Sequence, residues 1–111
     1  NSSMCEFCYL GAVGGVTLGD NCRIGSLVGV YAENHEVDDL EILIKDQVVR
    51  RSGVRIGNNC WIGSGVSILD GVSIGEGCVI GAGSLVNRDI KPNTVSAGVP
   101  ATVIRMRGEK R

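Results

Sequence analysis

A six-residue spacing of aliphatic side chains constrains the fold of this chain more than any other feature. Over residues 56–86 an isoleucine or valine returns at every sixth position: Ile56, Ile62, Ile68, Ile74, Ile80 and Val86. Four residues further on, a second column holds small or aliphatic residues: Cys60, Val66, Val72, Cys78, Ser84 and Ile90. A helix would spread side chains six apart over different faces, and an ordinary antiparallel sheet needs longer strands. Each six is therefore predicted to form one short strand that sends one large and one small residue inward.

A third column predicts how these strands are joined. Asn59, Gly65, Gly71, Gly77 and Gly83 follow one another at the same spacing, and glycine and asparagine best tolerate the left-handed backbone conformation. A left-handed residue at fixed intervals indicates a corner at fixed intervals. Because one short strand cannot bury its apolar side alone, the units must stack. The sequence thus predicts an all-β fold, a β-helix with three strands and three corners per coil.

The same pattern occurs earlier in the chain and then breaks off. Leu18 and Ile24 open two sixes, with Asn21 at the corner between them. Residues 32–52 are charged and aperiodic, and the six-residue phase slips across them, so we expect one long excursion loop there. We interpret residues 1–111 as a single domain with a C-terminal capping segment and basic tail at 92–111. The chain begins with Asn1 rather than methionine, and we expect a fragment that lacks its N-terminus.

Composition and cysteine spacing exclude several classes of function. The net charge of −1 gives no electrostatic footprint for nucleic acid, and the apolar runs are too short for a membrane span. Cys5 and Cys8 form a lone C-x-x-C without a second pair or a nearby histidine, so we expect no metal. Cys22, Cys60 and Cys78 fall in the small inward column, as core residues do. An odd cysteine count without a disulfide framework favours a reducing, cytoplasmic location.

Four stretches of the sequence carry a family resemblance: "VRIGNNCWIGSGVSIL", "VIGAGSLVNRDIKPNTV", "AGVPATVIR" and "YAENHEVDD". They resemble the hexapeptide-repeat acyltransferases, most closely the sugar or maltose-type O-acetyltransferases. The resemblance implies a left-handed parallel β-helix and transfer of an acetyl group from acetyl-CoA to a hydroxyl of a sugar or polysaccharide acceptor. It also implies a homotrimer in which each active site is shared between two prisms.

His35, the single histidine, is the catalytic residue that this resemblance implies. It ends a Y-x-x-x-H pattern that starts at Tyr31, and in the resembling enzymes such a histidine acts as general base on the acceptor. A sugar hydroxyl is too weak an acid to ionise near neutral pH, whereas an imidazole can accept its proton during attack. Which group orients the ring stays open among Glu33, Glu36 and Asp38.

The resemblance also implies a binding site for the donor, acetyl-CoA. Ser64, Ala82, Asn87 and Arg88 match positions that contact acetyl-CoA, and Arg105 matches a phosphate-binding residue, with Arg107, Lys110 and Arg111 nearby. Trp61 precedes an inward isoleucine, so we expect it to point out of the prism and pack between subunits near the acetyl group. Thr102 departs from the lysine or arginine often found at its position, which puts one phosphate contact in doubt.

Competing interpretations start from the same repeat, since one fold hosts many activities. A γ-class carbonic anhydrase needs three histidines, and this chain has one. Serine acetyltransferase shares "GVTLG", but its sequence around the catalytic histidine is missing. A xenobiotic acetyltransferase of the streptogramin or chloramphenicol type remains an alternative, as does a non-catalytic β-helix assembly module.

Overall fold

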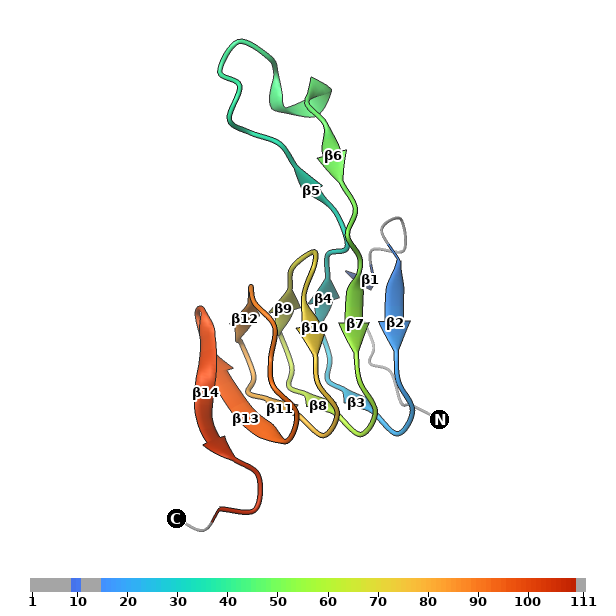
Figure 1. Ribbon diagram of the computed structural model, residues 1–111, viewed down its shortest axis with the longest axis vertical. Helices are drawn as coiled ribbons and strands as arrows, with labels where there is room; N and C mark the ends of the chain where they lie inside the picture. The colour runs from blue at the N-terminus through green and yellow to red at the C-terminus, as the bar shows by residue number, and fades with distance from the viewer. Residues whose placement is uncertain (1–8, 11–14, 110–111) are drawn as a thin grey trace.

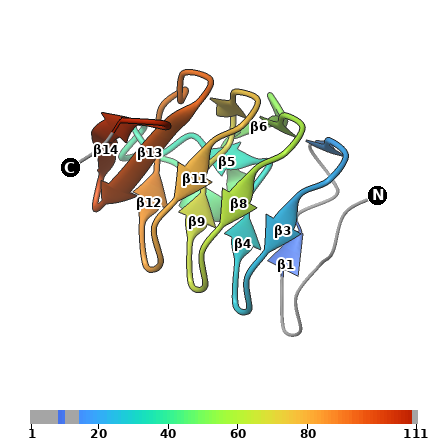
Figure 2. The same cartoon turned by 90° about the horizontal axis from the view of Figure 1, so that it is seen from below.

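The computed structural model describes residues 9–10 and 15–109 and confirms the predicted left-handed parallel β-helix (Figures 1 and 2). Short parallel strands stack into three faces. Face A contains β3 (Arg23–Ile24), β8 (Trp61–Ile62), β11 (Val79–Ile80), β13 (Thr94–Gly98) and β14 (Ala101–Met106). Face B contains β1 (Tyr9–Leu10), β4 (Gly29–Val30), β9 (Ser67–Ile68) and β12 (Leu85–Val86). Face C contains β2 (Val16–Leu18), β7 (Val54–Ile56) and β10 (Ser73–Ile74), extended by a bridge from Ile74 to Ile90.

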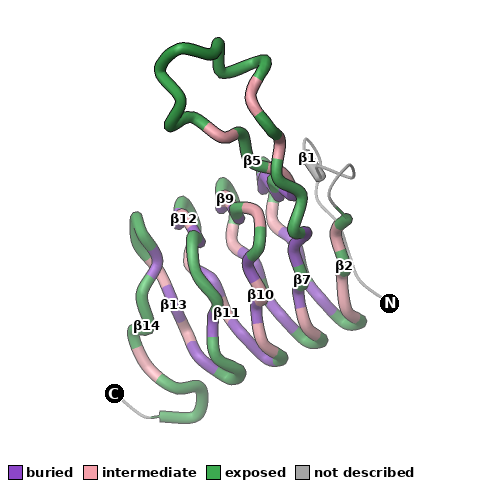
Figure 3. The backbone as a smooth tube through the Cα atoms, turned by 45° about the horizontal axis from the view of Figure 1, so that its top comes forward, coloured by how far each residue is buried: buried purple, intermediate pink, exposed green. Residues whose placement is uncertain are grey.

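Strand register follows the six-residue columns. Ile24, Ile62 and Ile80 are paired across face A, and Val30, Ile68 and Val86 across face B. All members of the large and small columns are buried, with Ile62, Val66, Ile68, Cys78 and Val86 at 0% exposure. The core is therefore a thin ladder of aliphatic side chains along the prism axis, as the spacing predicts (Figure 3).

The corners form three edges, named here by the faces that they join. Edge AB consists of residues 25–28, 63–66 and 81–84, edge BC of 31–53, 69–72 and 87–89, and edge CA of 19–22, 57–60, 75–78 and 91–93. The predicted corner residues adopt positive φ, among them Asn59 at 56° and Gly71 at 85°. Leu27 also does so, at 61°, although its bulky side chain gave no sign of a corner.

The chain leaves the prism once, between β4 and β7, in a segment (residues 31–53) that we call the arm. It projects from edge BC, away from the stacked coils (Figure 1). The arm contains the antiparallel strands β5 (Asn34–His35) and β6 (Val49–Arg50) and a short 3-10 helix, η2 (Ile44–Asp46), none of which the sequence pattern indicated. At the other end, β14 turns back antiparallel to β13 and ends face A, a hairpin that the six-residue pattern also missed.

Candidate active site

His35 lies at the root of the arm, where the chain leaves the prism. Its partner across the β5–β6 pair is Val49, and the neighbouring Asn34 is paired with Arg50. The backbone N–H of Glu36 donates to the carbonyl of Val48 at 2.8 Å, which continues the pairing by one residue. The His35 side chain is exposed at edge BC, so an acceptor can reach the imidazole from outside the prism.

The acidic neighbours of His35 are engaged elsewhere. Glu36 forms an ion pair with Arg50, and Glu33 forms one with Arg51 at 3.4 Å. Asp38, the third candidate for orienting the ring, is exposed. Within the described ranges no hydrogen bond of the imidazole is formed. Two of the three candidate partners therefore stabilise the arm root by pairing with arginine.

Two contacts fix the position of this root on the prism. The Asp70 carboxylate accepts hydrogen bonds from the backbone N–H groups of Ser52 and Gly53, the latter at 2.8 Å, where the arm returns. Where the arm departs, the Tyr31 ring lies against Gly29, and a Cβ at Gly29 would lie 2.5 Å from the Tyr31 hydroxyl. The Tyr31 ring therefore occupies the space above Gly29 where the chain departs toward His35.

Ser64 and Ala82 occupy edge AB in two successive coils. The N–H of Gly83 donates to the carbonyl of Ser64 at 2.9 Å, so the two corners are stacked directly. Both side chains are exposed. A Cβ added at Gly63 would lie 2.6 Å from the Ala82 nitrogen, which shows that the coils here pack as closely as backbones allow. This edge is a smooth strip of small residues.

Trp61 points out of face A, as its position in the repeat predicts, and its side chain is 61% exposed. It is paired with Arg23 on one side and Val79 on the other. A hollow of about 170 Å³ lies beside it, lined by Asn21, Arg23, Asn59, Cys60, Trp61, Val79 and Arg107. Arg107 is tied down there, because its Nη1 donates to the Gly77 carbonyl at 2.8 Å.

The remaining predicted donor residues lie at the C-terminal end of the prism. Asn87 and Arg88 are exposed on edge BC just after β12. Arg105 lies on β14 opposite Val95, half-buried, with one Nη1 bond of 3.3 Å to the Met106 carbonyl. Its Nε is buried and has no hydrogen-bond partner. An arginine guanidinium suits an anion such as a phosphate, but the enclosed Nε of Arg105 is not open to one. Lys110 and Arg111 lie outside the described residues, as do Cys5 and Cys8.

The predicted residues of one chain therefore form separate groups. His35, Asn87 and Arg88 lie on edge BC, Ser64 and Ala82 lie on edge AB, and Trp61 and Arg105 lie on face A. Face B separates His35 from the edge AB group. A single prism does not bring the histidine and the strip of small residues together.

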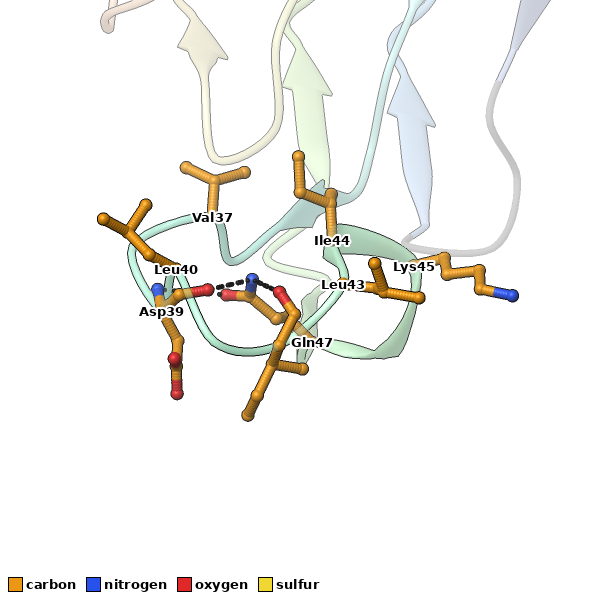
Figure 4. Close-up of a pocket in the computed structure, with 8 residues that line it drawn as sticks. Val37, Asp39, Leu40, Leu43, Ile44, Lys45 and Gln47 are labelled. Carbon is orange, nitrogen blue, oxygen red and sulfur yellow. Dashed lines mark hydrogen bonds between the residues drawn. The ribbon is translucent and has the colours of Figure 1, made fainter.

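The outer part of the arm contains a hollow that the sequence gave little reason to expect (Figure 4). It measures about 480 Å³ and is lined by Val37, Asp39, Leu40, Ile42, Leu43, Ile44, Lys45 and Gln47. The Gln47 amide closes the loop by donating to the carbonyls of Asp39 and Ile42 at 2.9 and 2.8 Å. The apolar run "LEILI" was the available signal, but it lies inside a charged, aperiodic segment.

Neither a metal-binding cluster nor a membrane-spanning helix is found in the described residues. In ranges 9–10 and 15–109, no group of three or more histidine, cysteine or acidic side chains is placed to hold a metal ion. Nor does this part of the chain contain a helix with the length and apolar character needed to cross a bilayer.

Family models match most of the repeat region. The bacterial transferase hexapeptide (six repeats) model matches residues 53–88, and the model for the hexapeptide repeat of succinyl-transferase matches residues 8–31. With the fold and the columns described above, these matches define the class: the chain belongs to the hexapeptide-repeat acyltransferase family.

Within this class, the chain is similar to galactoside O-acetyltransferase from Escherichia coli (strain K12), with 49% identity over 90 residues. That alignment covers 81% of this chain and 43% of the relative. A solved galactoside acetyltransferase in complex with coenzyme A superimposes with a TM-score of 0.81 at 44% identity, covering 89% of this chain and 48% of that one. AntD, an N-acyltransferase from Bacillus cereus in complex with dTDP and 3-hydroxybutyryl-CoA, superimposes at 0.85 with 26% identity, covering 96% and 60%. The chain thus spans about half the length of such relatives.

Proposed function

We propose that the protein is an acetyl-CoA-dependent O-acetyltransferase whose acceptor is a hydroxyl of a sugar or polysaccharide. The 49% identity to a galactoside O-acetyltransferase is the observation that carries this proposal. The exposed position of His35 at the fixed root of the arm supports it. AntD, an N-acyltransferase also solved with dTDP-4-amino-4,6-dideoxyglucose and coenzyme A, supports a second candidate, an amino-sugar acceptor, at 26% identity.

In this mechanism the His35 imidazole accepts the proton of the acceptor hydroxyl as its oxygen attacks the thioester carbonyl. The tetrahedral intermediate then collapses, the C–S bond breaks, and the thiolate of coenzyme A takes up the proton. The product is an acetyl ester. Because Glu33 and Glu36 are paired with arginines, we propose that Asp38 or a group of a neighbouring subunit orients the ring.

We assign the donor to edge AB and the C-terminal end of the prism. The pantetheine arm would lie against Ser64 and Ala82, where stacked backbones leave a smooth strip. The phosphates would lie near Arg88, Asn87 and Arg105. Binding acetyl-CoA also fits the predicted cytoplasmic location, and so do the free thiols of Cys22, Cys60 and Cys78.

A homotrimer would bring the separate groups together. If prisms pack side by side, the His35 edge of one subunit can face the edge AB strip and Trp61 of the next. The chain has one tryptophan, and it is 61% exposed in the single chain. We therefore expect sedimentation to give a trimer and tryptophan emission to be blue-shifted from that of a solvated indole. A monomer with solvated emission would contradict the shared site.

The central experiment measures thiol release from acetyl-CoA with galactosides, other sugars, amino sugars, chloramphenicol and a streptogramin as acceptors. With the best acceptor, His35→Ala should lower kcat by about a hundredfold or more, and the wild-type rate should fall in acid as the imidazole becomes protonated. Asn34→Ala, an exposed neighbour on the same strand, is the matched control. Turnover of His35→Ala within about threefold of wild type would refute the general-base role.

Arg105→Ala should instead raise the KM for acetyl-CoA with a smaller effect on kcat, because it removes binding shared by the ground and transition states. Arg55→Ala, an exposed arginine on face C, controls for the loss of one positive charge. An unchanged KM for Arg105→Ala would remove the phosphate contact from the proposal. If none of the acceptors gives thiol release and acetyl-CoA does not bind, the results would favour a non-catalytic assembly module.

A further inference from the structure

Leu27 occupies a backbone conformation that its side chain disfavours. Its φ is +61°, and the three other non-glycine residues with positive φ in the described ranges are all asparagines: Asn21, Asn59 and Asn93. In the next two coils of edge AB the same corner is occupied by Gly65 at +71° and Gly83 at +74°. A left-handed backbone costs energy for a residue with a branched side chain. The six-residue pattern would be better satisfied by glycine or asparagine at this position.

Among the described residues, the Leu27 side chain gains no compensating burial. It is 65% exposed, whereas the neighbouring Val28 is 1% exposed and belongs to the core. Contacts within the described part of the chain therefore do not explain a leucine at this corner. Residues held in such conformations often lie at binding or catalytic sites, so a contact with a bound molecule is a reasonable explanation to test.

Leu27 lies at one end of a strip that is otherwise open. We call Ser64, Gly65, Ala82 and Gly83 the edge AB strip. A Cβ at Gly83 would meet no atom within 4 Å, and a Cβ at Gly65 would meet only Gly83, at 4.0 Å. The backbone N–H of Gly65 donates to the carbonyl of Ser26 at 2.9 Å, so the corner that carries Leu27 is stacked directly on the strip. Leu27 is thus the large side chain in the coil that precedes this strip.

The proposed function gives the strip a direction, because it places the donor phosphates near Arg88 and Arg105, in the last coil and its closing hairpin, at the end opposite Leu27. A donor lying along the strip with its phosphates at the basic end would direct its acyl group toward Leu27. This step rests on the proposed function, because it takes an acyl-CoA as the occupant of the strip.

Acyl groups of different length occur on this fold. AntD was solved with 3-hydroxybutyryl-CoA, which has a four-carbon acyl group, and the similar galactoside enzyme is by its name an acetyltransferase. We propose that Leu27 limits the length of the acyl group in this protein. Its side chain contacts the acetyl methyl group and fills the space that a third and fourth carbon would need.

The test compares the binding of acetyl-CoA and butyryl-CoA to the full chain by calorimetry. The wild type should bind butyryl-CoA about tenfold or more weakly than acetyl-CoA, since small differences in chain length give discrimination of this order. Leu27→Gly and Leu27→Asn should reduce that ratio to within about threefold, because they remove the side chain that excludes the third and fourth carbons. Both variants suit the corner, so their thermal midpoints should equal or exceed that of the wild type.

Leu69→Ala is the matched control, because Leu69 is an exposed leucine at edge BC of the next coil, and its ratio should stay at the wild-type value. If the wild type binds acetyl-CoA but the ratio is near one, or if Leu27→Gly leaves the ratio unchanged, the assignment of Leu27 is wrong while the proposed function stands. A changed oligomeric state of Leu27→Gly with an unchanged ratio would assign Leu27 to a subunit contact. If the wild type binds neither donor, the proposed function fails, and the role of Leu27 fails with it.

Discussion

The prism and the arm use the same kinds of apolar side chain in opposite ways. In the prism, isoleucines such as Ile62 and Ile68 are at 0% exposure and stack on one another from coil to coil. In the arm, Ile44 is 57% exposed, Leu40 is 93% exposed, and the segment is held by polar contacts of Gln47, Glu36 and Arg50. Burial of apolar area supplies most folding free energy. The prism should therefore determine stability, while the arm carries the candidate catalytic residue.

The largest effect should come from removing the same side chain in the two regions. Ile62→Ala leaves a cavity in the core ladder and should lower the free energy of unfolding by about 2–5 kcal/mol. Ile44→Ala removes an exposed side chain in η2 and should change it by about 0.5 kcal/mol or less. Denaturant unfolding at one protein concentration gives both values. Losses of similar size would contradict the difference between the two regions.

The corners of the prism give a second prediction about its stability. Gly71→Val places a β-branched residue at a φ of 85°, where its Cβ would meet only the Ser52 Cβ at an ordinary 3.8 Å. The expected loss of about 1–2 kcal/mol therefore reports backbone conformation alone. Ser67→Val, on the outer side of strand β9, is the control and should cost little in the same unfolding experiment. A Gly71→Val protein as stable as Ser67→Val would mean that the corner tolerates a branched residue.

These differences explain how far the sequence alone could predict the molecule. Each coil repeats the same six-residue pattern, so the column from Ile56 to Val86 defines the register of strands β7 to β12, and Asn59 and Gly71 mark corners between them. The arm has no such repetition. Its shape depends on individual contacts, such as the Gln47 amide with two carbonyls and Asp70 with Ser52 and Gly53. Periodicity carries no information on contacts of that kind.

The candidate site shows the same limit. Trp61 was predicted to point outward because its place in the six is fixed by Ile62, and the structure has it exposed. The surroundings of His35 could not be predicted from the sequence. Arg50 and Arg51, on the returning side of the arm, form ion pairs with Glu36 and Glu33, which were candidates to orient the imidazole. Leu27 was missed because a leucine gives no sequence signal for a left-handed corner.

The smallest predicted effect concerns the cysteines of edge CA. The sequence indicated compact apolar core residues, yet each thiol donates to a carbonyl of the next coil. Cys22 Sγ lies 3.1 Å from the Gly57 oxygen, Cys60 Sγ 3.2 Å from that of Gly75, and Cys78 Sγ 3.0 Å from that of Lys91.

A hydroxyl already occupies the end of the same column, where it donates within its own corner. Thr94 is 1% exposed, and its Oγ1 donates to the Lys91 carbonyl at 2.8 Å.

Cys60→Thr and Cys60→Val therefore form a test pair of equal shape, one with a donor and one without. At an ordinary apolar position the threonine variant would be the less stable, by about 1–3 kcal/mol. Here the Gly75 carbonyl can accept its hydroxyl proton, so the threonine variant should equal or exceed the valine variant by about 0.5–1 kcal/mol. If Cys60→Thr is less stable than Cys60→Val by the ordinary loss of about 1–3 kcal/mol, the cysteines act only as apolar filling, and donation to the next coil adds nothing to the stability of the prism.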